Sequence, residues 1–528
     1  MIENPNSMSI ESLEVLQVVP EGFRLSDARL TDFDCSKSSC EPTITSEGMR
    51  YLLARPFGPK EKLAVHVLLQ TTLASVSGNF TTDVKGLYGG KEIRVIATNR
   101  IVISEIFKYR DPSTQREVWR LTNPKVLSDH AYFYERDISK DNSFVVFVSN
   151  RTGSRQLFLA RLPSGEIIQL THERWLSRYS FSMSPDDREV FYVATGETGI
   201  ALKALRLPDL SLREVHHFSS DWRFHSEIAV SSDGKLLGFV EIWSSDDDAG
   251  AEFPLCRIVV SKADGSRSWV VHQEGYNLGH PQFRPVYNDM IMFSHDEQRE
   301  HAIWFVDVDG SDLRSVTLAK GLERIVHQFW SADGSKIFYM HFPKWYGEDA
   351  TVRLLDPVTL KEQVLMPASG WSHFEANRDL SLLVGDSVTT PYIFLANVTT
   401  RLEFPLCEHG TSWKDYSALY PGVVTSSQDS HPHPAFSDDG NMIIFNSDRD
   451  GLPAVYLVLL RDVFHENSSG PGARCPELQA YWAFHSTQAN SWSSSSKVAR
   501  RRFLKYLGLV CPGVLDGSGG FPVWSDES

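Results

Sequence analysis

The chain is poor in cysteine and has no long apolar segment. It contains six cysteines in 528 residues, and only Cys35 and Cys40 lie close together. This low count argues against a disulfide framework and favours a reduced compartment. No apolar run reaches the length of about 18 residues that a membrane-spanning helix needs. Residues Met1 to Pro5 have neither a basic start nor an apolar core, so we expect no secretory signal and predict a cytoplasmic protein.

Positive charge is also in short supply. The chain has 52 lysines and arginines against 67 aspartates and glutamates, which gives a formal net charge of −15. This balance argues against nucleic acid and against an anionic membrane surface as partners. It also repels an anionic substrate at long range, so such a substrate would have to be held by a local cluster of cations. The sequence does not indicate an oligomeric state.

Apolar and aromatic residues, by contrast, are ample for a large core. Hydrophobic residues make up 41% of the chain and aromatic residues 11%, so most of it should be folded. Residues 1–104 contain no unit that repeats later, and we treat them as an N-terminal extension of uncertain structure. Residues 465–528 begin with a Ser/Gly-rich stretch, and we predict a disordered tail there.

Between these extensions, residues 105–464 repeat a single unit. Each unit has an apolar lead-in, a Ser-x-Asp-Gly turn or a variant of it, and a β-rich run, which together are typical of a hairpin. The turns begin 45 to 60 residues apart, a period typical of a β-propeller blade. Seven turns predict an all-β, seven-bladed propeller. They begin at Ser139, Ser184, Ser231, Arg284, Ser331, Asn377 and Ser437.

A histidine-rich stretch precedes the last turn. It reads Gln428-Asp429-Ser430-His431-Pro432-His433-Pro434. Interpreted as a strand, it places His431 and His433 on one face, because side chains repeat every two residues. The flanking prolines fit a strand start or an edge. On this pattern alone, the two imidazoles are either metal ligands or polar residues at a sheet edge.

Histidines also recur at one position of the repeat. The residues four positions before the turn are His280, His327, His373 and His433 in four consecutive units. In propellers with this turn, the strand before it lines the central channel, so the four side chains should converge. They either pack the channel and bond one another and water, or form a metal or catalytic site. Neutral imidazoles suit a borderline divalent ion, and convergence on one axis favours the second interpretation.

The sequence resembles the oligogalacturonate lyases of pectin breakdown over residues 110–462. The segments that carry the resemblance follow the family's order and spacing. They are Trp119-Arg120-Leu121-Thr122, Tyr132-Phe133-Tyr134, Gly279-His280-Pro281, His327-Gln328-Phe329-Trp330, Ser372-His373, Gly385-Asp386, Thr411-Ser412-Trp413-Lys414 and Gln428 to Pro434.

The resemblance implies a seven-bladed propeller with a divalent ion, typically Mn²⁺, and an oligogalacturonide substrate. Matched position by position, the implied metal ligands are His373, Gln428, His431 and His433, and the implied Brønsted base is His327. The implied reaction is β-elimination across a uronic acid, with no organic cofactor. A cation on the substrate carboxylate would stabilise the negative charge that develops, and a neutral histidine would take the proton.

One position departs from the family pattern. The family usually has an arginine where this chain has Ala302, ahead of Ile303 and Trp304. Losing a charge-assisted donor in a dry site raises a barrier by roughly 2–4 kcal/mol. Arg299 and His301 are the nearby candidates to supply a cation in its place. We assign His280, Arg299 and Lys414 to substrate binding.

Three functions are therefore compared. The first is a lyase on short oligogalacturonides, and the second is a metal-binding propeller with altered or lost activity. The third is a scaffold without catalysis, since fold alone does not fix function, but a scaffold has no need of a channel lined with histidines. The propeller of a serine peptidase is disfavoured, because no hydrolase domain with Gly-x-Ser-x-Gly follows residue 464.

Overall fold

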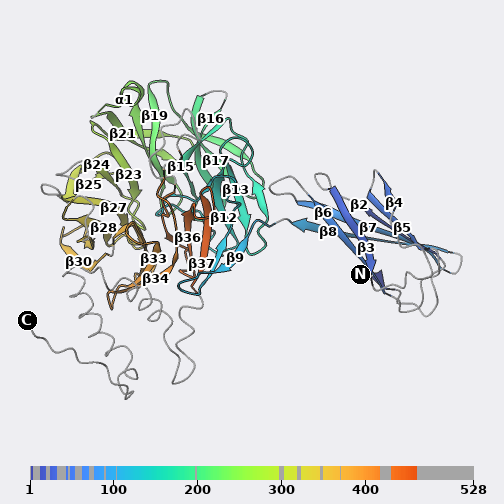
Figure 1. Ribbon diagram of the computed structural model, residues 1–528. Helices are drawn as coiled ribbons and strands as arrows, with labels where there is room; N and C mark the ends of the chain where they lie inside the picture. Colours follow the sequence, from blue (N-terminus) through green and yellow to red (C-terminus); the bar gives the residue numbers. More distant parts are fainter. Residues whose placement is uncertain are drawn as a thin grey trace, which may run out of the picture. The chain divides into compact units, whose positions relative to one another are not determined.

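The computed structural model describes residues 104–460, apart from short gaps, and the backbone of eight strands within residues 2–102. The gaps are residues 197–198, 252, 296–301, 318–322, 345–348, 369, 415 and 417–429. The predicted tail 465–528 lies outside the described residues. Within residues 104–460 the strands form seven antiparallel sheets, which confirms the predicted seven-bladed propeller (Figure 1).

Six blades contain four consecutive strands each. The strands of blades 1 to 3 are β11 (Ser128–Asp129), β12 (Phe144–Ser149), β13 (Gln156–Arg161), β14 (Ile167–Gln169); β15 (Trp175–Met183), β16 (Glu189–Gly196), β17 (Gly199–Arg206), β18 (Leu212–His217); and β19 (Trp222–Val230), β20 (Leu236–Trp243), β21 (Leu255–Lys262), β22 (Ser268–Gly275). Those of blades 4 to 6 are β23 (Leu278–Phe283), β24 (Met290–His295), β25 (Ile303–Asp307), β26 (Arg314–Thr317); β27 (Arg324–Trp330), β28 (Ile337–Phe342), β29 (Thr351–Leu355), β30 (Glu362–Pro367); and β31 (Trp371–Ala376), β32 (Leu382–Ser387), β33 (Tyr392–Asn397), β34 (Leu402–Glu408).

The seventh blade closes the ring with strands from both ends of the repeat. Its sheet has five strands in the order β35 (Ala435–Phe436), β36 (Met442–Ser447), β37 (Ala454–Leu459), β10 (Glu117–Arg120) and β9 (Phe107–Arg110). β10 pairs with β37 through Val118 and Val458. Figure 1 shows the orange strands β36 and β37 beside the blue strand β9. Closure in this way joins the two ends of the repeat by backbone hydrogen bonds within one sheet.

The five turns that begin with serine share one hydrogen-bonding scheme, illustrated by the last copy. Ser437 Oγ donates to Asp439 Oδ1 at 2.7 Å and accepts the amide of Met442 at 3.0 Å. The fourth position is left-handed, with φ of 69° at Gly440 and 58° at Asn142. Glycine and asparagine tolerate that conformation at low cost, which explains why they recur there.

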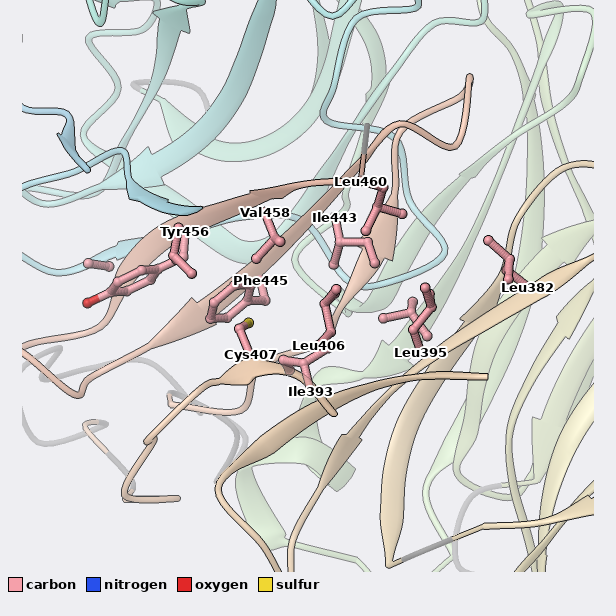
Figure 2. Close-up of a cluster of buried hydrophobic side chains, with 13 residues drawn as sticks. Leu382, Ile393, Leu395, Leu406, Cys407, Ile443, Phe445, Tyr456, Val458 and Leu460 are labelled. Carbon is pink, nitrogen blue, oxygen red and sulfur yellow. The ribbon is translucent and has the colours of Figure 1, made fainter. Parts of the chain in front are cut away.

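Apolar side chains fill the space between neighbouring blades. Figure 2 shows the cluster between blades 6 and 7, where residues of β32, β33 and β34 meet those of β36 and β37. Burying such a side chain fully is worth about 1.5–3 kcal/mol, so these layers hold the ring that positions the site. Its labelled members are Leu382, Ile393, Leu395, Leu406, Cys407, Ile443, Phe445, Tyr456, Val458 and Leu460.

The N-terminal segment, whose structure the sequence left uncertain, has eight described strands in two antiparallel sheets. One sheet has the order β1-β6-β3 and the other β4-β5-β2-β7-β8. The strands are β1 (Ile2–Glu3), β2 (Ser12–Val18), β3 (Arg24–Thr31), β4 (Thr43–Thr45), β5 (Gly48–Leu53), β6 (Lys62–Gln70), β7 (Ser77–Tyr88) and β8 (Lys91–Val102).

Helix is scarce in the described part of the chain. α1 (Ser244–Ala249) follows β20, and Asp247 in this helix pairs with Arg223 at 3.1 Å. The acidic run there is thus partly neutralised by an arginine of β19. Among the described residues, no helix has the length and apolarity to cross a membrane.

Candidate metal centre

The innermost strands of blades 4 to 6 bring three of the predicted histidines to the channel. His280 lies on β23, His327 on β27 and His373 on β31. The pairing of each strand shifts register at or next to the histidine, as it does between Val326 and Phe329. A β-bulge of this kind re-aims a side chain, and bulges concentrate next to active sites.

Backbone strain accompanies these positions. His280, His327 and His433 have φ values of 53°, 56° and 48°, in the left-handed region. A residue with a Cβ pays about 1–3 kcal/mol to stay there, and such strain clusters at functional sites. The same conformation occurs at Tyr179 and Ser226 in the bulges of blades 2 and 3, with φ of 53° and 72°, so it belongs to the bulge of the innermost strands and places whichever residue stands there.

The interpretation of residues 431–434 as a strand is wrong. β35 begins only at Ala435, and the four residues before it are irregular. Pro432 and Pro434 have no N–H to donate to a ladder. The carbonyl of Pro432 instead accepts the amide of Asn446 at 2.9 Å. His431 and His433 nevertheless approach each other, with ring centroids 5.8 Å apart.

Three of the four predicted metal ligands meet in one cluster. A nitrogen of His373, one of His431 and one of His433 lie within 4.8 Å of one another. The ring of His373 is 4.1 Å from that of His433 and 5.3 Å from that of His431. His373 and His433 are fully buried, and His431 is partly exposed. Three imidazoles at this spacing could hold a divalent metal ion.

A buried carboxylate orients the central histidine. Asp386 on β32 accepts the amide of His373 at 2.7 Å and its Nδ1–H at 2.9 Å. This bond keeps the proton on Nδ1 and leaves the lone pair on Nε2, the arrangement that metal-binding histidines usually have. Burial lowers the pKa of His373 to about 3, so the ring is neutral and can donate its lone pair.

Aromatic residues hold the other two members of the cluster. The hydroxyl of Tyr179 lies 3.3 Å from Nδ1 of His433. The ring of Trp413 stands edge-on to His431, with centroids 4.7 Å apart. These contacts leave each imidazole few alternative orientations.

His327 lies directly beside the cluster. Its ring centroid is 4.5 Å from that of His373. Nδ1 of His327 donates to the carbonyl of Ser372 at 2.6 Å, so Nε2 carries the lone pair. Burial, followed by the neighbouring His373 and His280, lowers the pKa of His327 well below its ordinary value. A neutral imidazole with one nitrogen held by a carbonyl is suited to accept a proton.

His280 sits in a different environment. Its Nδ1 lies 2.7 Å from the hydroxyl of Tyr134 and 3.3 Å from Oε2 of Glu227. Its ring stacks on Tyr132, with centroids 5.5 Å apart. The ring of Tyr132 in turn lies beside that of His433, with centroids 4.8 Å apart. His280 is therefore next to the cluster, with a carboxylate behind it.

Several of these supporting residues were not identified as functional from the sequence. Tyr132 and Phe133 belong to the connection between β11 and β12, and Phe133 contacts both His327 and His373. They lie outside the turn register that located the histidines. Asp386 and Tyr132 belong to segments that carry the family resemblance, and this was the available signal.

The remaining predicted site residues have mixed positions. Lys414 is exposed, and its carbonyl accepts Ser430 Oγ at 2.8 Å, next to His431. Gln428 and Arg299 lie outside the described residues. Ala302 is 4% exposed and packs in the apolar cluster between blades 4 and 5.

A cavity of about 350 Å³ opens at the turn end of the innermost strands. It is lined by residues that directly precede the turns, among them Phe283, Trp330, Ala376 and Phe436. The described histidines of the cluster are not part of this lining. The cavity nevertheless adjoins the cluster, because Phe133, which contacts His327 and His373, is part of its lining.

Comparison with protein families finds one that spans the propeller. The family model described as oligogalacturonate lyase matches residues 96–464. An oligogalacturonide lyase from Pectobacterium atrosepticum is 28% identical over 384 residues, which are 67% of this chain and 96% of the relative. An oligogalacturonate lyase from Dickeya dadantii is 28% identical over 382 residues, with coverages of 67% and 96%.

Two solved structures have the same fold. One, described as an oligogalacturonate lyase in complex with manganese, is 29% identical with a TM-score of 0.63 and covers 68% of this chain and 98% of its own. The other, an oligogalacturonate lyase from Vibrio parahaemolyticus, is 27% identical with a TM-score of 0.62 and covers 69% and 98%.

Proposed function

The chain belongs to the oligogalacturonate lyase family, and we propose that it cleaves short oligogalacturonides by metal-assisted β-elimination, releasing an unsaturated uronate. The observation that carries this proposal is the contact between the histidine cluster and His327. One group of imidazoles suits a cation, and a neutral imidazole suited to proton removal stands beside it. We place this activity in the cytoplasm and assign it to residues 105–464.

His373, His431 and His433 would hold the divalent ion, with Gln428 as the fourth ligand. The three described donors fit such an ion, because they are imidazole nitrogens within 4.8 Å of one another and His373 is oriented by a carboxylate. Mn²⁺ is our choice of ion, since a solved relative is described as a manganese complex. When bound, the ion supplies positive charge to the substrate carboxylate.

His327 would act as the base. Its bond to the Ser372 carbonyl keeps the proton on Nδ1 and presents Nε2 to the proton on the carbon that bears the carboxylate. Lys414, which is exposed near His431, and Arg299 would hold further carboxylates of the substrate. Removal of the proton and departure of the glycosidic oxygen leave a double bond in the uronate product.

A second candidate is a metal-binding propeller with altered or lost activity. The observation that favours it is Ala302, which is buried among apolar residues where family members usually have arginine. This side chain has no donor to offer a substrate carboxylate. In that case the protein would load metal normally but would not turn over digalacturonate.

The two candidates separate in one assay. Purified protein loaded with Mn²⁺ is mixed with digalacturonate, and ultraviolet absorbance of the unsaturated product is followed. The lyase is expected to generate this signal, and His327→Gln should lower the rate by about 10²–10⁴-fold while binding Mn²⁺ as the wild type does. Metal-loaded wild type without product would favour the second candidate, and Ala302→Arg would then test whether the missing arginine is the cause.

A further inference from the structure

His280 and His327 lie on the innermost strands of neighbouring blades, but their Nδ1 atoms have different kinds of hydrogen-bond partner. Nδ1 of His327 faces a backbone carbonyl, whereas Nδ1 of His280 faces a hydroxyl and a carboxylate. The carbonyl holds a proton on Nδ1 of His327, and the carboxylate stabilises an imidazolium at His280. Environments that separate two titratable groups in this way are how active sites assign an acid and a base.

The hydrogen bonds around His280 form a continuous network that ends at the carboxylate of Glu227. The Tyr134 hydroxyl donates to Glu227 Oε2 at 3.3 Å, so it accepts from Nδ1–H of His280 at 2.7 Å. Ser226 Oγ also donates to Glu227 and accepts the amide of His280 at 2.9 Å. Because Nδ1 is the nitrogen held by this network, Nε2 is the nitrogen that would deliver a proton.

Glu227 is placed to remain ionised despite its burial. Its side chain is 9% exposed and lies 3.3 Å from Nδ1 of His280. Burial would raise the pKa of Glu227, but the charge of His280 and hydrogen bonds from His280 and Ser226 lower it below its ordinary value. The ionised carboxylate of Glu227 beside Nδ1 would stabilise a proton held by His280.

We propose that His280 is the general acid that protonates the oxygen leaving the substrate, with Glu227 and Tyr134 as positioning residues. This inference rests on the proposed lyase function and gives His280 a catalytic role beyond substrate binding. In a galacturonate ring the proton on C5 and the oxygen on C4 point to opposite faces. A donor on the face opposite the base is therefore the one placed to protonate the leaving oxygen.

The step balances with these two histidines. His327 Nε2 takes the C5 proton, and the electron pair of the C5–H bond forms the C4–C5 double bond. The C4–O bond breaks, and its oxygen takes the proton from Nε2 of His280. The products are the unsaturated uronate and a fragment with a free hydroxyl. Exchange with water returns both histidines to their starting protonation.

The test compares two substrates whose leaving groups differ in their need for a proton donor. The leaving group of digalacturonate is a poorly stabilised sugar alkoxide. A galacturonate that carries a 4-nitrophenyl group on O4 instead releases 4-nitrophenolate, which is a stable anion. His280→Gln in the Mn²⁺-loaded protein should lower kcat on digalacturonate by about 10²–10⁴-fold but lower it on the nitrophenyl substrate by less than about 10-fold. Glu227→Gln and Tyr134→Phe should show the same asymmetry with smaller losses.

The control variant is His327→Gln, which should slow both substrates, because each requires removal of the C5 proton. Circular dichroism and Mn²⁺ content confirm that every variant is folded and loaded. Equal losses on both substrates in His280→Gln, or a change confined to KM, would overturn the acid role and leave the lyase proposal standing. A wild type inactive on both substrates would overturn the lyase function and this inference together.

Discussion

The carboxylate of Asp386 should control how tightly the histidine cluster binds metal. Asp386 is fully buried and accepts two hydrogen bonds from His373, one from its amide and one from Nδ1–H. In Asp386→Asn, the side-chain oxygen can keep the amide bond, but the NH₂ group then faces Nδ1. Two donors cannot bond each other, so the ring proton is driven to Nε2, the nitrogen that the metal needs.

The expected loss follows from this change of tautomer. Removing an outer partner of a ligating histidine typically costs 10–100-fold in metal affinity, which is about 1.4–2.7 kcal/mol. Isothermal titration of chelator-treated protein with Mn²⁺ at neutral pH measures the Kd directly. The matched control is Asp309→Asn, an exposed turn aspartate whose side chain accepts hydrogen bonds from the neighbouring Ser311, and this variant should bind Mn²⁺ as the wild type does.

The reasoning would be refuted by an Asp386→Asn protein that is folded and binds Mn²⁺ with the wild-type Kd. That result would mean that His373 is not a ligand or that Nε2 is not its ligand atom. A lower affinity in both aspartate variants would instead indicate a general effect of lost charge in this acidic protein.

Three further changes test the cluster and the fold. His431→Ala should lower Mn²⁺ occupancy measured by elemental analysis, because it removes one of the three converging nitrogens. Burial raises the pKa of Glu135, so above the ordinary pKa of a glutamate the folded protein keeps a proton that the unfolded chain has lost. The free energy of unfolding therefore falls as the pH rises above that ordinary pKa. Glu135→Gln should therefore be more stable than wild type in urea at pH 8 and gain nothing below about pH 4.5. Val118→Ala, in the closing strand, should cost roughly 1.5–3 kcal/mol of unfolding free energy, whereas the exposed Val358→Ala should change it by less than about 0.5 kcal/mol.

The ring of blades was predictable because each turn carries its own local signal. Ser437 and Asp439 fix a hairpin by bonds within five residues, and such bonds repeat with the sequence. Counting those turns therefore yields the number of blades. It also places His280, His327 and His373 at one level of the channel, because the distance from turn to channel is the same in each blade.

The parts that were not predictable depend on contacts between distant segments. Tyr132 reaches the cluster from a connection in blade 1, and Glu227 reaches His280 from blade 3. No spacing in the sequence indicates that these distant segments meet in the folded protein. The strand interpretation of residues 431–434 failed for a local reason: Pro432 lacks the N–H that a ladder requires, so the stretch is irregular and its histidines converge through loop geometry.

The most direct test of the proposed function is the fate of water during cleavage of digalacturonate. The reaction is run in isotope-labelled water with Mn²⁺-loaded protein, and the products are analysed by mass spectrometry and ultraviolet absorbance. Elimination predicts an absorbing unsaturated uronate in which no labelled oxygen has entered the broken bond, and loss of the reaction on chelation. Labelled, non-absorbing galacturonate would show hydrolysis, and intact substrate with fully metal-loaded protein would show that the centre does not act on this bond.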